Sequence, residues 1–359
     1  MNHEAVPYLA SPKKKSELHL TKKRQVNGRV VSGQLVSKDG TGAFKVVAGT
    51  PLLQPEGDPA RLNYPIPQIL LGDRAYEIMK HFYELGREHF LDNLYAYMVD
   101  TLGKSGIRKA FEQYHNRTAV SRYEPFRPMV DPPSPVPGIS RYDFARSVQK
   151  MRPQWGKHRL EMLWSRTWAT HLPDFVERII EREPGIMVEL GCGACLGTQA
   201  VVESCHSFQR LLTLDISFGC AKGAEALFIY QGQIKRVDPV VGNFWFLPVK
   251  RKSVDVVFSH SGLDEAREID RVLEEVFEVL KPGGAFISAS RESPNFPARV
   301  FDKLGFSADE KQEMASIARL YAGPDNLCEI AESKGLKTIA IVPAGKRSRM
   351  LFVFESIGN

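Results

Sequence analysis

A glycine turn that follows a short apolar segment is the part of the sequence best suited to bind a ligand. Residues 188–197 are VELGCGACLG, and they join the apolar run Ile186–Leu190 to a stretch with helical spacing. Gly191 and Gly193 let the backbone approach a ligand closely, and a helix start offers unpaired N–H groups and the positive end of its dipole. The pattern favours an anionic or polar ligand. A dinucleotide-binding turn would have a third glycine at position 196, where this chain has Leu196.

A carboxylate and an amide follow the next two apolar runs. The run Leu211–Leu214 ends at Asp215, about 20 residues after the glycine turn, and a carboxylate at this place can accept both hydroxyl protons of a ribose. The run Val237–Val241 is followed by Gly242, Asn243 and Phe244. Asp215 could instead cap a helix, and Asn243 could be a turn residue without a ligand.

Apolar runs alternate with helical stretches through the second half of the chain. Continuous apolar strands alternating with helices indicate a parallel sheet covered on both faces. The strands expected are Ile186–Leu190, Leu211–Leu214, Val237–Val241, Val254–Phe258 and Ala285–Ala289, and the helices are Thr198–Ser207, Cys220–Tyr230, Asp264–Leu280 and Asp325–Ser333. The segments Leu336–Val342 and Met350–Glu355 are expected to form a closing antiparallel hairpin.

These motifs together resemble the class I S-adenosylmethionine-dependent methyltransferases, in particular the group that includes the quinone-biosynthesis enzymes. The resemblance covers about residues 187–290, where ELGCG, LDIS, LPV with SVDVVFS, and LKPGG stand in the order of the family. It implies an α/β fold with a doubly wound, mostly parallel seven-stranded sheet, preceded here by an N-terminal α+β extension. It also implies S-adenosyl-L-methionine as the cofactor.

The resemblance assigns the cofactor contacts residue by residue. Glu189, Gly191 and Gly193 would line the methionine part, Asp215 would hold the ribose, and Asn243 stands where the family often has an Asp facing the adenine amine. Cys195 stands where a glycine is common. The full set implied as cofactor-binding is Glu189, Gly191, Cys192, Gly193, Asp215, Ile216, Asn243, Phe244 and Ser259.

The segment after the fourth predicted strand would face the methyl group. Methyl transfer from a sulfonium is an in-line displacement that mainly requires the acceptor atom to lie near 3 Å from the methyl carbon. His260 and Asp264 are the candidate catalytic residues, with His260 as the base by its ordinary pKa. Alternatively, His260 only packs and Asp264 caps the next helix. Residues 259–262 are SHSG, so the motif of nucleic-acid amino-methyltransferases is absent there.

The cysteines predict free thiols. All five lie in the second half of the chain, and an odd number without a disulfide framework suits a reducing cytoplasm. Cys192 and Cys195 form a C-x-x-C, but no second Cys or His pair stands nearby, so we expect neither a metal nor redox chemistry. The chain has no apolar run long enough to span a bilayer and no secretion signal pattern, so a cytoplasmic location is expected.

The first half of the chain predicts an accessory region. We expect a flexible basic tail over residues 1–25, an α+β cap or accessory region over 26–123, a proline-rich linker over 124–140 and the methyltransferase domain over 141–359. The segments Arg29–Val36 and Gly42–Val47 predict a small hairpin in the accessory region. The tail carries the basic residues Lys13, Lys14, Lys15, Lys22, Lys23 and Arg24, which could attract phosphates or simply be solvated.

Three functions are compatible with this sequence. The first is a methyltransferase acting on a small or medium-sized acceptor, with the N-terminal part shaping the substrate pocket and a small-molecule substrate as its partner. The second is an RNA or protein methyltransferase that docks through the basic N-terminus. The third is a non-catalytic cofactor-binding scaffold. The sequence does not determine the oligomeric state.

Overall fold

The computed structural model describes the first 54 residues and most of residues 172–357. The described residues are 1–54, 103, 105–106, 172–193, 195–216, 220–221, 224–225, 228–229, 232–263, 266, 268–291, 305–310, 323–343 and 349–357. The proline-rich segment 124–140 and Asp264 lie outside the described residues, as does most of the accessory region predicted over residues 26–123.

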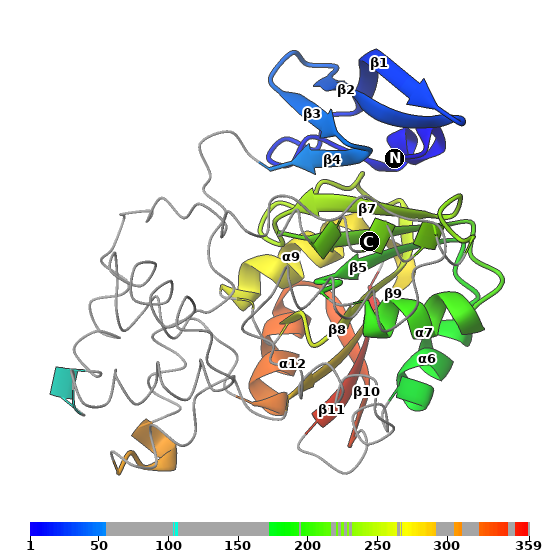
Figure 1. Ribbon diagram of the computed structural model, residues 1–359. Coiled ribbons are helices and arrows are strands. Elements are labelled where there is room, and N and C mark those ends of the chain that lie inside the picture. The colour runs from blue at the N-terminus through cyan, green and yellow to red at the C-terminus, as the bar shows by residue number, and fades with distance from the viewer. Residues whose placement is uncertain are drawn as a thin grey trace.

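A single sheet of eleven strands organises the described residues (Figure 1). Its order is β1-β2-β3-β4-β7-β6-β5-β8-β9-β11-β10. The strands are β1 (Leu18–Val26), β2 (Arg29–Ser37), β3 (Ala43–Val47), β4 (Thr50–Leu53), β5 (Ile186–Leu190), β6 (Arg210–Asp215), β7 (Val237–Gly242), β8 (Val254–His260), β9 (Leu280–Arg291), β10 (Leu336–Pro343) and β11 (Arg349–Ser356). The helices are η1 (His3–Tyr8), α6 (Leu172–Ile180), α7 (Leu196–Ser204), α9 (Ile269–Val279) and α12 (Pro324–Ser333).

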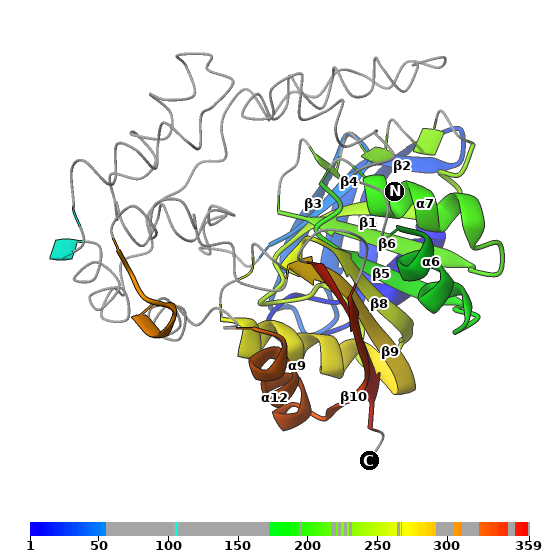
Figure 2. The same ribbon diagram turned by 90° about the horizontal axis from the view of Figure 1, so that it is seen from below.

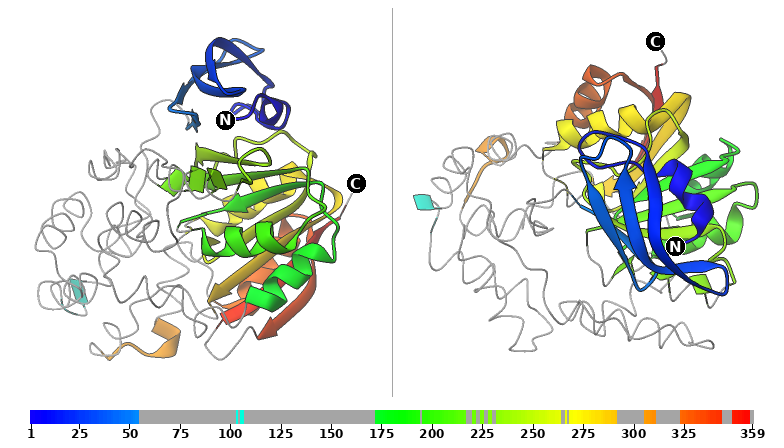
Figure 3. Two further views of the ribbon diagram at one scale, coloured as in Figure 1. Left: turned by 45° about the vertical axis from the view of Figure 1, so that its right-hand side comes forward. Right: turned by 90° about the horizontal axis from the view of Figure 1, so that it is seen from above.

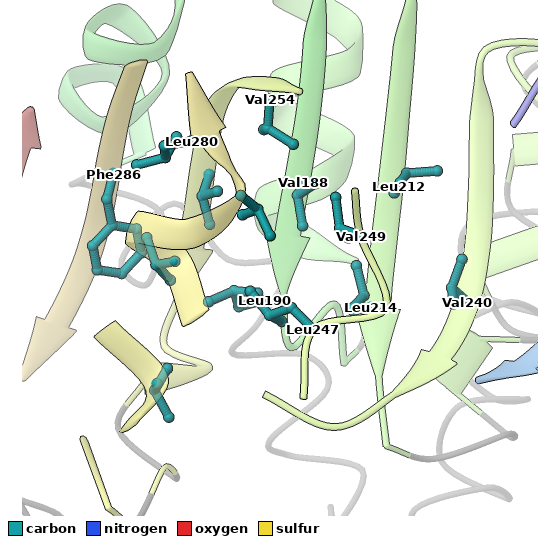
Figure 4. Close-up of a cluster of buried hydrophobic side chains, with 14 of the residues drawn as sticks. Val188, Leu190, Leu212, Leu214, Val240, Leu247, Val249, Val254, Leu280 and Phe286 are labelled. Carbon is teal, nitrogen blue, oxygen red and sulfur yellow. The ribbon is translucent and has the colours of Figure 1, made fainter. Parts of the chain in front are cut away.

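The five central strands, β7-β6-β5-β8-β9, run parallel and are covered by helices on both faces (Figure 2). Alternate side chains of each strand point to opposite faces. Val188 and Leu190 therefore join a core with the α9 residues Val272 and Val276, and Figure 4 shows part of this cluster. Met187 packs on the opposite face in the core that holds Phe175 and Val201 of α6 and α7. Burial on both faces is why these strands are almost uninterrupted apolar runs.

The order of the strands reverses at β5, and this reversal creates a place for a ligand. The chain passes from β5 to β6 and β7 on one side, and β8 and β9 lie on the other side. In an open parallel sheet, ligands bind outside the carboxyl ends of the strands where the order reverses. The turn after β5 lies at that point. The α/β fold with a mostly parallel core sheet, predicted from the sequence, is confirmed in this coarse form.

The N-terminal residues differ from the prediction in two respects. The strands β1–β4 are not a separate element but continue the sheet, because β4 pairs in parallel with β7 through Leu52 with Val241 and Leu53 with Gly242 (Figure 3). The sheet consequently has eleven strands, of which β1–β4 come from the N-terminal residues and the other seven from residues 186–356.

The flexible tail predicted for residues 1–25 is instead built into the fold. Leu9 and Leu18 are buried in the same core as Val249, and the backbone N–H of Asn2 donates to the Asp238 carboxylate across 2.6 Å. The Lys15 ammonium, which looked solvated from the sequence, is buried and paired with Glu275. The apolar residues between the lysines decide the structure, since their burial outweighs the solvation of a few exposed charges.

A helix must be both long and apolar to cross a bilayer. Among the described residues, none of the helices combines these two properties.

Candidate functional site

The glycine turn after β5 is held against the end of β6. The N–H groups of Gly191 and Cys192 both donate to the Leu214 carbonyl, at 2.8 and 3.1 Å. Gly191 has φ +79° and Gly193 has φ +49°, conformations that favour glycine. A Cβ on Gly191 would lie 2.9 Å from Gly262 Cα, closer than real Cβ atoms come to another atom. Gly191 therefore has to be a glycine, because the backbone at Gly262 packs directly against it.

Asp215 ends β6 beside this turn, as the sequence predicted from its position. Its side chain is only 2% exposed, and its Oδ2 accepts a hydrogen bond of 2.9 Å from the Gly193 N–H. The Cys192 sulfur lies 4.0 Å from the same oxygen. A carboxylate has about four lone-pair sites, so Asp215 can accept more than one hydrogen bond. The structure thus brings the acidic residue and the glycine turn together.

Glu189 is a buried carboxyl group under the first turn of α7. It is 1% exposed, and the Thr198 hydroxyl contacts both of its oxygens, at 2.8 and 2.6 Å. Burial raises the pKa of Glu189 to about 8; the hydrogen bond from Thr198 opposes this rise, and the nearby Asp215 charge adds to it. Thr198 was missed from the sequence. The signal that points to it is a hydroxyl residue in the first turn of the helix after the glycine turn.

The raised pKa of Glu189 makes a prediction about stability. The carboxyl ionises near 4.5 in the unfolded chain but stays protonated up to about pH 8 when folded, so we expect the free energy of unfolding to fall as the pH rises between these values. Glu189→Gln cannot titrate and keeps an oxygen for Thr198, so it should flatten this part of the pH profile. Urea unfolding of both proteins at a series of pH values measures the effect, and identical slopes would rule out the assignment.

The two cysteines of the turn are buried thiols. The Cys195 N–H donates to the Cys192 carbonyl across 2.6 Å, which closes the turn just before α7. Cys195 has φ +61°, a left-handed backbone conformation that favours glycine. This conformation explains why a glycine is common at this place, although the chain has a cysteine here. The adjacent Cys195 thiol and burial raise the pKa of Cys192 well above its usual range, which disfavours the thiolate that metal binding or redox chemistry would need. No three metal-ligating side chains gather anywhere in the described ranges.

The segment after β7 forms a second wall beside the glycine turn. Asn243 Oδ1 accepts the Trp245 N–H at 3.0 Å, so part of its hydrogen-bonding capacity closes a turn, as the alternative interpretation of this residue expected. The Phe244 ring lies beside Gly191, since its Cζ would be 3.3 Å from a Cβ on that glycine. Beyond Asp215, the Ile216 carbonyl accepts from Gln54 Nε2 at 3.5 Å. The accessory strands thus reach the edge where the cofactor residues lie.

Ser259 joins the end of β8 to the end of β5. Its hydroxyl donates to the Leu190 carbonyl and accepts the Leu263 N–H, both at 3.0 Å, and the side chain is fully buried. Gly262 lies so close that a Cβ there would be 2.1 Å from the Leu190 carbonyl oxygen. Gly262 was not singled out from the sequence, where it was only the last residue of SHSG. The close approach of two backbone segments that makes it necessary is a tertiary feature.

His260 lies on the opposite face of β8 from Ser259. Its ring centroid is 5.6 Å from that of Phe175, and a Cβ on Gly197 would lie 2.5 Å from His260 Cβ. His260 therefore packs between α6 and the first turn of α7. These contacts agree with the packing interpretation and also fix the ring at the carboxyl edge of the sheet.

Two further hydroxyl groups lie near Ser259 and were not predicted. Ser288 of β9 pairs in register with Ser259 of β8, and Ser288 Oγ lies 2.6 Å from Ser290 Oγ. Both serines are fully buried. Polar side chains therefore continue along the carboxyl edge of the sheet from β5 to β9.

The comparisons with known proteins agree with this arrangement. Residues 188–288 match the family described as a methyltransferase domain. The chain is 29% identical over 136 residues to the demethylmenaquinone methyltransferase of Lactococcus lactis, an alignment that covers 38% of this chain and 52% of the relative. It is 36% identical over 105 residues to squalene methyltransferase 1 of Botryococcus braunii, covering 29% and 27%. The chain spans about half the length of the first of these relatives and about a quarter of the second.

Solved structures also resemble the chain at low identity. The N-methyltransferase NodS from Bradyrhizobium japonicum, in complex with S-adenosyl-L-homocysteine, is 13% identical with a TM-score of 0.40, over 59% of this chain and 98% of that one.

The matched segment carries the motifs, the buried acidic residue and the glycine turn described above. It is a class I S-adenosylmethionine-dependent methyltransferase domain, and the resemblance stated from the sequence is confirmed. The domain is that of a transferase enzyme, and its cofactor is S-adenosyl-L-methionine, as predicted.

Proposed function

We propose that this protein transfers a methyl group from S-adenosylmethionine to a small or medium-sized apolar acceptor. The single observation that carries the proposal is the buried Asp215 carboxylate, which accepts a hydrogen bond from the Gly193 N–H of the glycine turn. The acceptor class is supported by relatives named as demethylmenaquinone, squalene and 24-methylenesterol methyltransferases.

The residues present fit such a cofactor, which supplies an electrophilic methyl group on a sulfonium. We propose that Gly191, Cys192 and Gly193 offer the backbone along which its methionine part lies, with the Glu189 carboxyl beneath it. Asp215 accepts from the ribose hydroxyls, with Ile216 alongside. Asn243 and Phe244 border the adenine, and Ser259 holds the β8 segment in place. The sheet strands of residues 186–356 form the catalytic unit in this proposal.

The domain organisation is part of the same proposal. Residues 141–359 would form the methyltransferase domain, residues 26–123 the accessory region and residues 124–140 the linker between them. The pairing of β4 with β7 supports a role for the accessory strands beside the cofactor edge, because Leu53 pairs with Gly242 directly before Asn243.

The test is transfer of labelled methyl groups from S-adenosylmethionine into fractionated cell extract by the purified full chain. We expect label in an apolar, organic-extractable fraction, with Asp215→Ala as the inactive control. Label in RNA or protein would instead support an RNA or protein methyltransferase, the second of the three functions. Binding of the cofactor without label in any fraction would support a scaffold.

We also propose His260 as the general base for acceptors that lose a proton. Its place at the carboxyl end of β8 supports this role, and the Phe175 contact would hold the ring in one orientation. His260→Gln should lower kcat by about 10²-fold without changing the affinity for S-adenosylmethionine, and should remove the acidic limb of the pH–rate profile. An unchanged pH profile with a lower thermal stability would show that His260 only packs. Asp264, the other candidate catalytic residue, stays a prediction.

A further inference from the structure

The net positive charge of the chain is confined to its first 54 residues. This segment has nine Lys and Arg against three Asp and Glu, a net charge of +6. The whole chain has 48 basic and 42 acidic residues, also a net +6, so residues 55–359 are balanced. A neutral methyltransferase part is therefore joined to a strongly basic four-stranded extension of its sheet.

Part of this charge is already used inside the protein. Lys15 pairs with Glu275, Arg29 with Glu225, and Lys38 with Glu17. Six other basic residues remain. Lys13 and Lys14 are exposed in the turn before β1, where Lys13 lies over the Phe246 ring. Lys22, Lys23, Arg24 and Lys45 are exposed on β1 and β3, and no hydrogen bond or ion pair joins any of these four to another residue in the part of the chain that the structure describes. Four of the six remaining charges therefore lie on β1 and β3.

The pairing of the strands places these residues together. Arg24 of β1 pairs with Ser32 of β2, and Gln34, two residues further along β2, pairs with Lys45 of β3. Side chains two residues apart point to the same face of a strand, so Arg24 and Lys45 share a face with Val47. A bulge between Thr21 and Arg24 adds Lys22 and Lys23 to the same end of β1.

Exposed apolar side chains lie within this basic region. Val26 is 45% exposed and Val47 is 39% exposed, and they are two of the five large hydrophobic residues that are exposed among the described residues. We define the basic face as Lys22, Lys23, Arg24 and Lys45 together with Val26 and Val47. It lies on β1, which forms the edge of the sheet, and on β3, two strands further in.

We propose that the basic face docks the protein on an anionic lipid bilayer. This inference rests on the proposed function, because an apolar acceptor would reside in a bilayer. Basic side chains are attracted to anionic headgroups, and valines can enter the headgroup boundary. The β4–β7 pairing then connects the docked strands directly to the cofactor edge.

A bilayer fits the basic face better than single-stranded RNA does. Proteins that bind single strands stack the bases on exposed aromatic rings. The aromatic residue of these four strands, Phe44, packs against the hydrophobic core, and the exposed apolar residues are valines. The face therefore combines charge with aliphatic contact.

The test is co-sedimentation of the full chain with vesicles of phosphatidylcholine, alone or mixed with phosphatidylglycerol. We expect salt-sensitive binding only to the mixed vesicles. The triple variant Lys22→Gln, Lys23→Gln, Arg24→Gln should bind them about a hundredfold more weakly, since each basic residue near the surface is worth about fivefold. The matched control Arg178→Gln, Lys235→Gln, Lys337→Gln removes the same charge from exposed positions outside the basic face and should bind as the wild type does.

Three outcomes would overturn the proposal: equal binding to both kinds of vesicle, equal loss in the two triple variants, or binding of the basic face to labelled single-stranded RNA and not to vesicles. Val26→Ser with Val47→Ser should weaken vesicle binding further without altering the charge. Calorimetry with S-adenosylmethionine separates this proposal from the function, because the triple variant should bind the cofactor unchanged. A wild type that binds vesicles but not the cofactor would contradict the proposed function alone.

Discussion

Replacing Asp215 by alanine is expected to weaken the binding of S-adenosylmethionine by between about 10²- and 10⁴-fold. Two losses combine in this variant. The ribose hydroxyls lose a buried acceptor, and the Gly193 N–H loses the oxygen that it contacts at 2.9 Å. Each lost hydrogen bond to a charged group costs about 1.5–3 kcal/mol, and about 1.4 kcal/mol is a tenfold change in affinity. Isothermal titration calorimetry with the purified chain measures the change.

The variant Asp215→Asn provides the matched control. It keeps the shape of the side chain and an oxygen for the Gly193 N–H, but it loses the charge and one acceptor. We expect its affinity to lie between those of the wild type and Asp215→Ala. Unchanged affinity in Asp215→Ala would remove the central contact from the proposed site, whereas equal losses in both variants would assign the whole effect to the charge.

Gly262→Ala is expected to reduce the free energy of unfolding by about 3 kcal/mol and to weaken cofactor binding as well. The added Cβ would lie 2.1 Å from the Leu190 carbonyl oxygen and 2.9 Å from Ser259 Oγ. One of the two backbone segments must move, and forced overpacking of this kind costs about 1–3 kcal/mol or more. Because Leu190 directly precedes the glycine turn, its displacement would also disturb Gly191. Urea denaturation and calorimetry measure the two effects.

Gly232→Ala separates this clash from the general effect of removing a glycine. Gly232 has φ +71°, but nothing lies within 4 Å of a Cβ built on it. Only the cost of a left-handed backbone remains there, about 1–2 kcal/mol, and the cofactor affinity should not change. A Gly262→Ala protein that is as stable as Gly232→Ala and binds the cofactor normally would show that the β8 segment can move away from β5 freely.

Local patterns in the sequence were sufficient for the central part of the fold. The strand Ile186–Leu190 was predicted with the bounds that β5 has, because a strand buried on both faces needs apolar residues at every position. The pairing of the glycine turn with Asp215 was also predictable, since the carboxyl ends of neighbouring parallel strands meet at one edge. Helix starts were less predictable: α9 begins at Ile269, five residues after the predicted start at Asp264.

The remaining features depend on contacts between residues that are distant in the sequence. The sequence by itself determined the class of domain, its central strands and the acidic residue at the cofactor edge, because each depends on the pattern of one segment or on motif order. Only the tertiary structure decided that the basic N-terminus is folded onto β7, that Thr198 covers the buried Glu189, and that Gly262 must lack a side chain. The physical reason is that the burial of a residue depends on the segment that packs against it. For the N-terminal residues this segment is β7, which is distant in the sequence: Leu52 pairs with Val241, and Asn2 contacts Asp238.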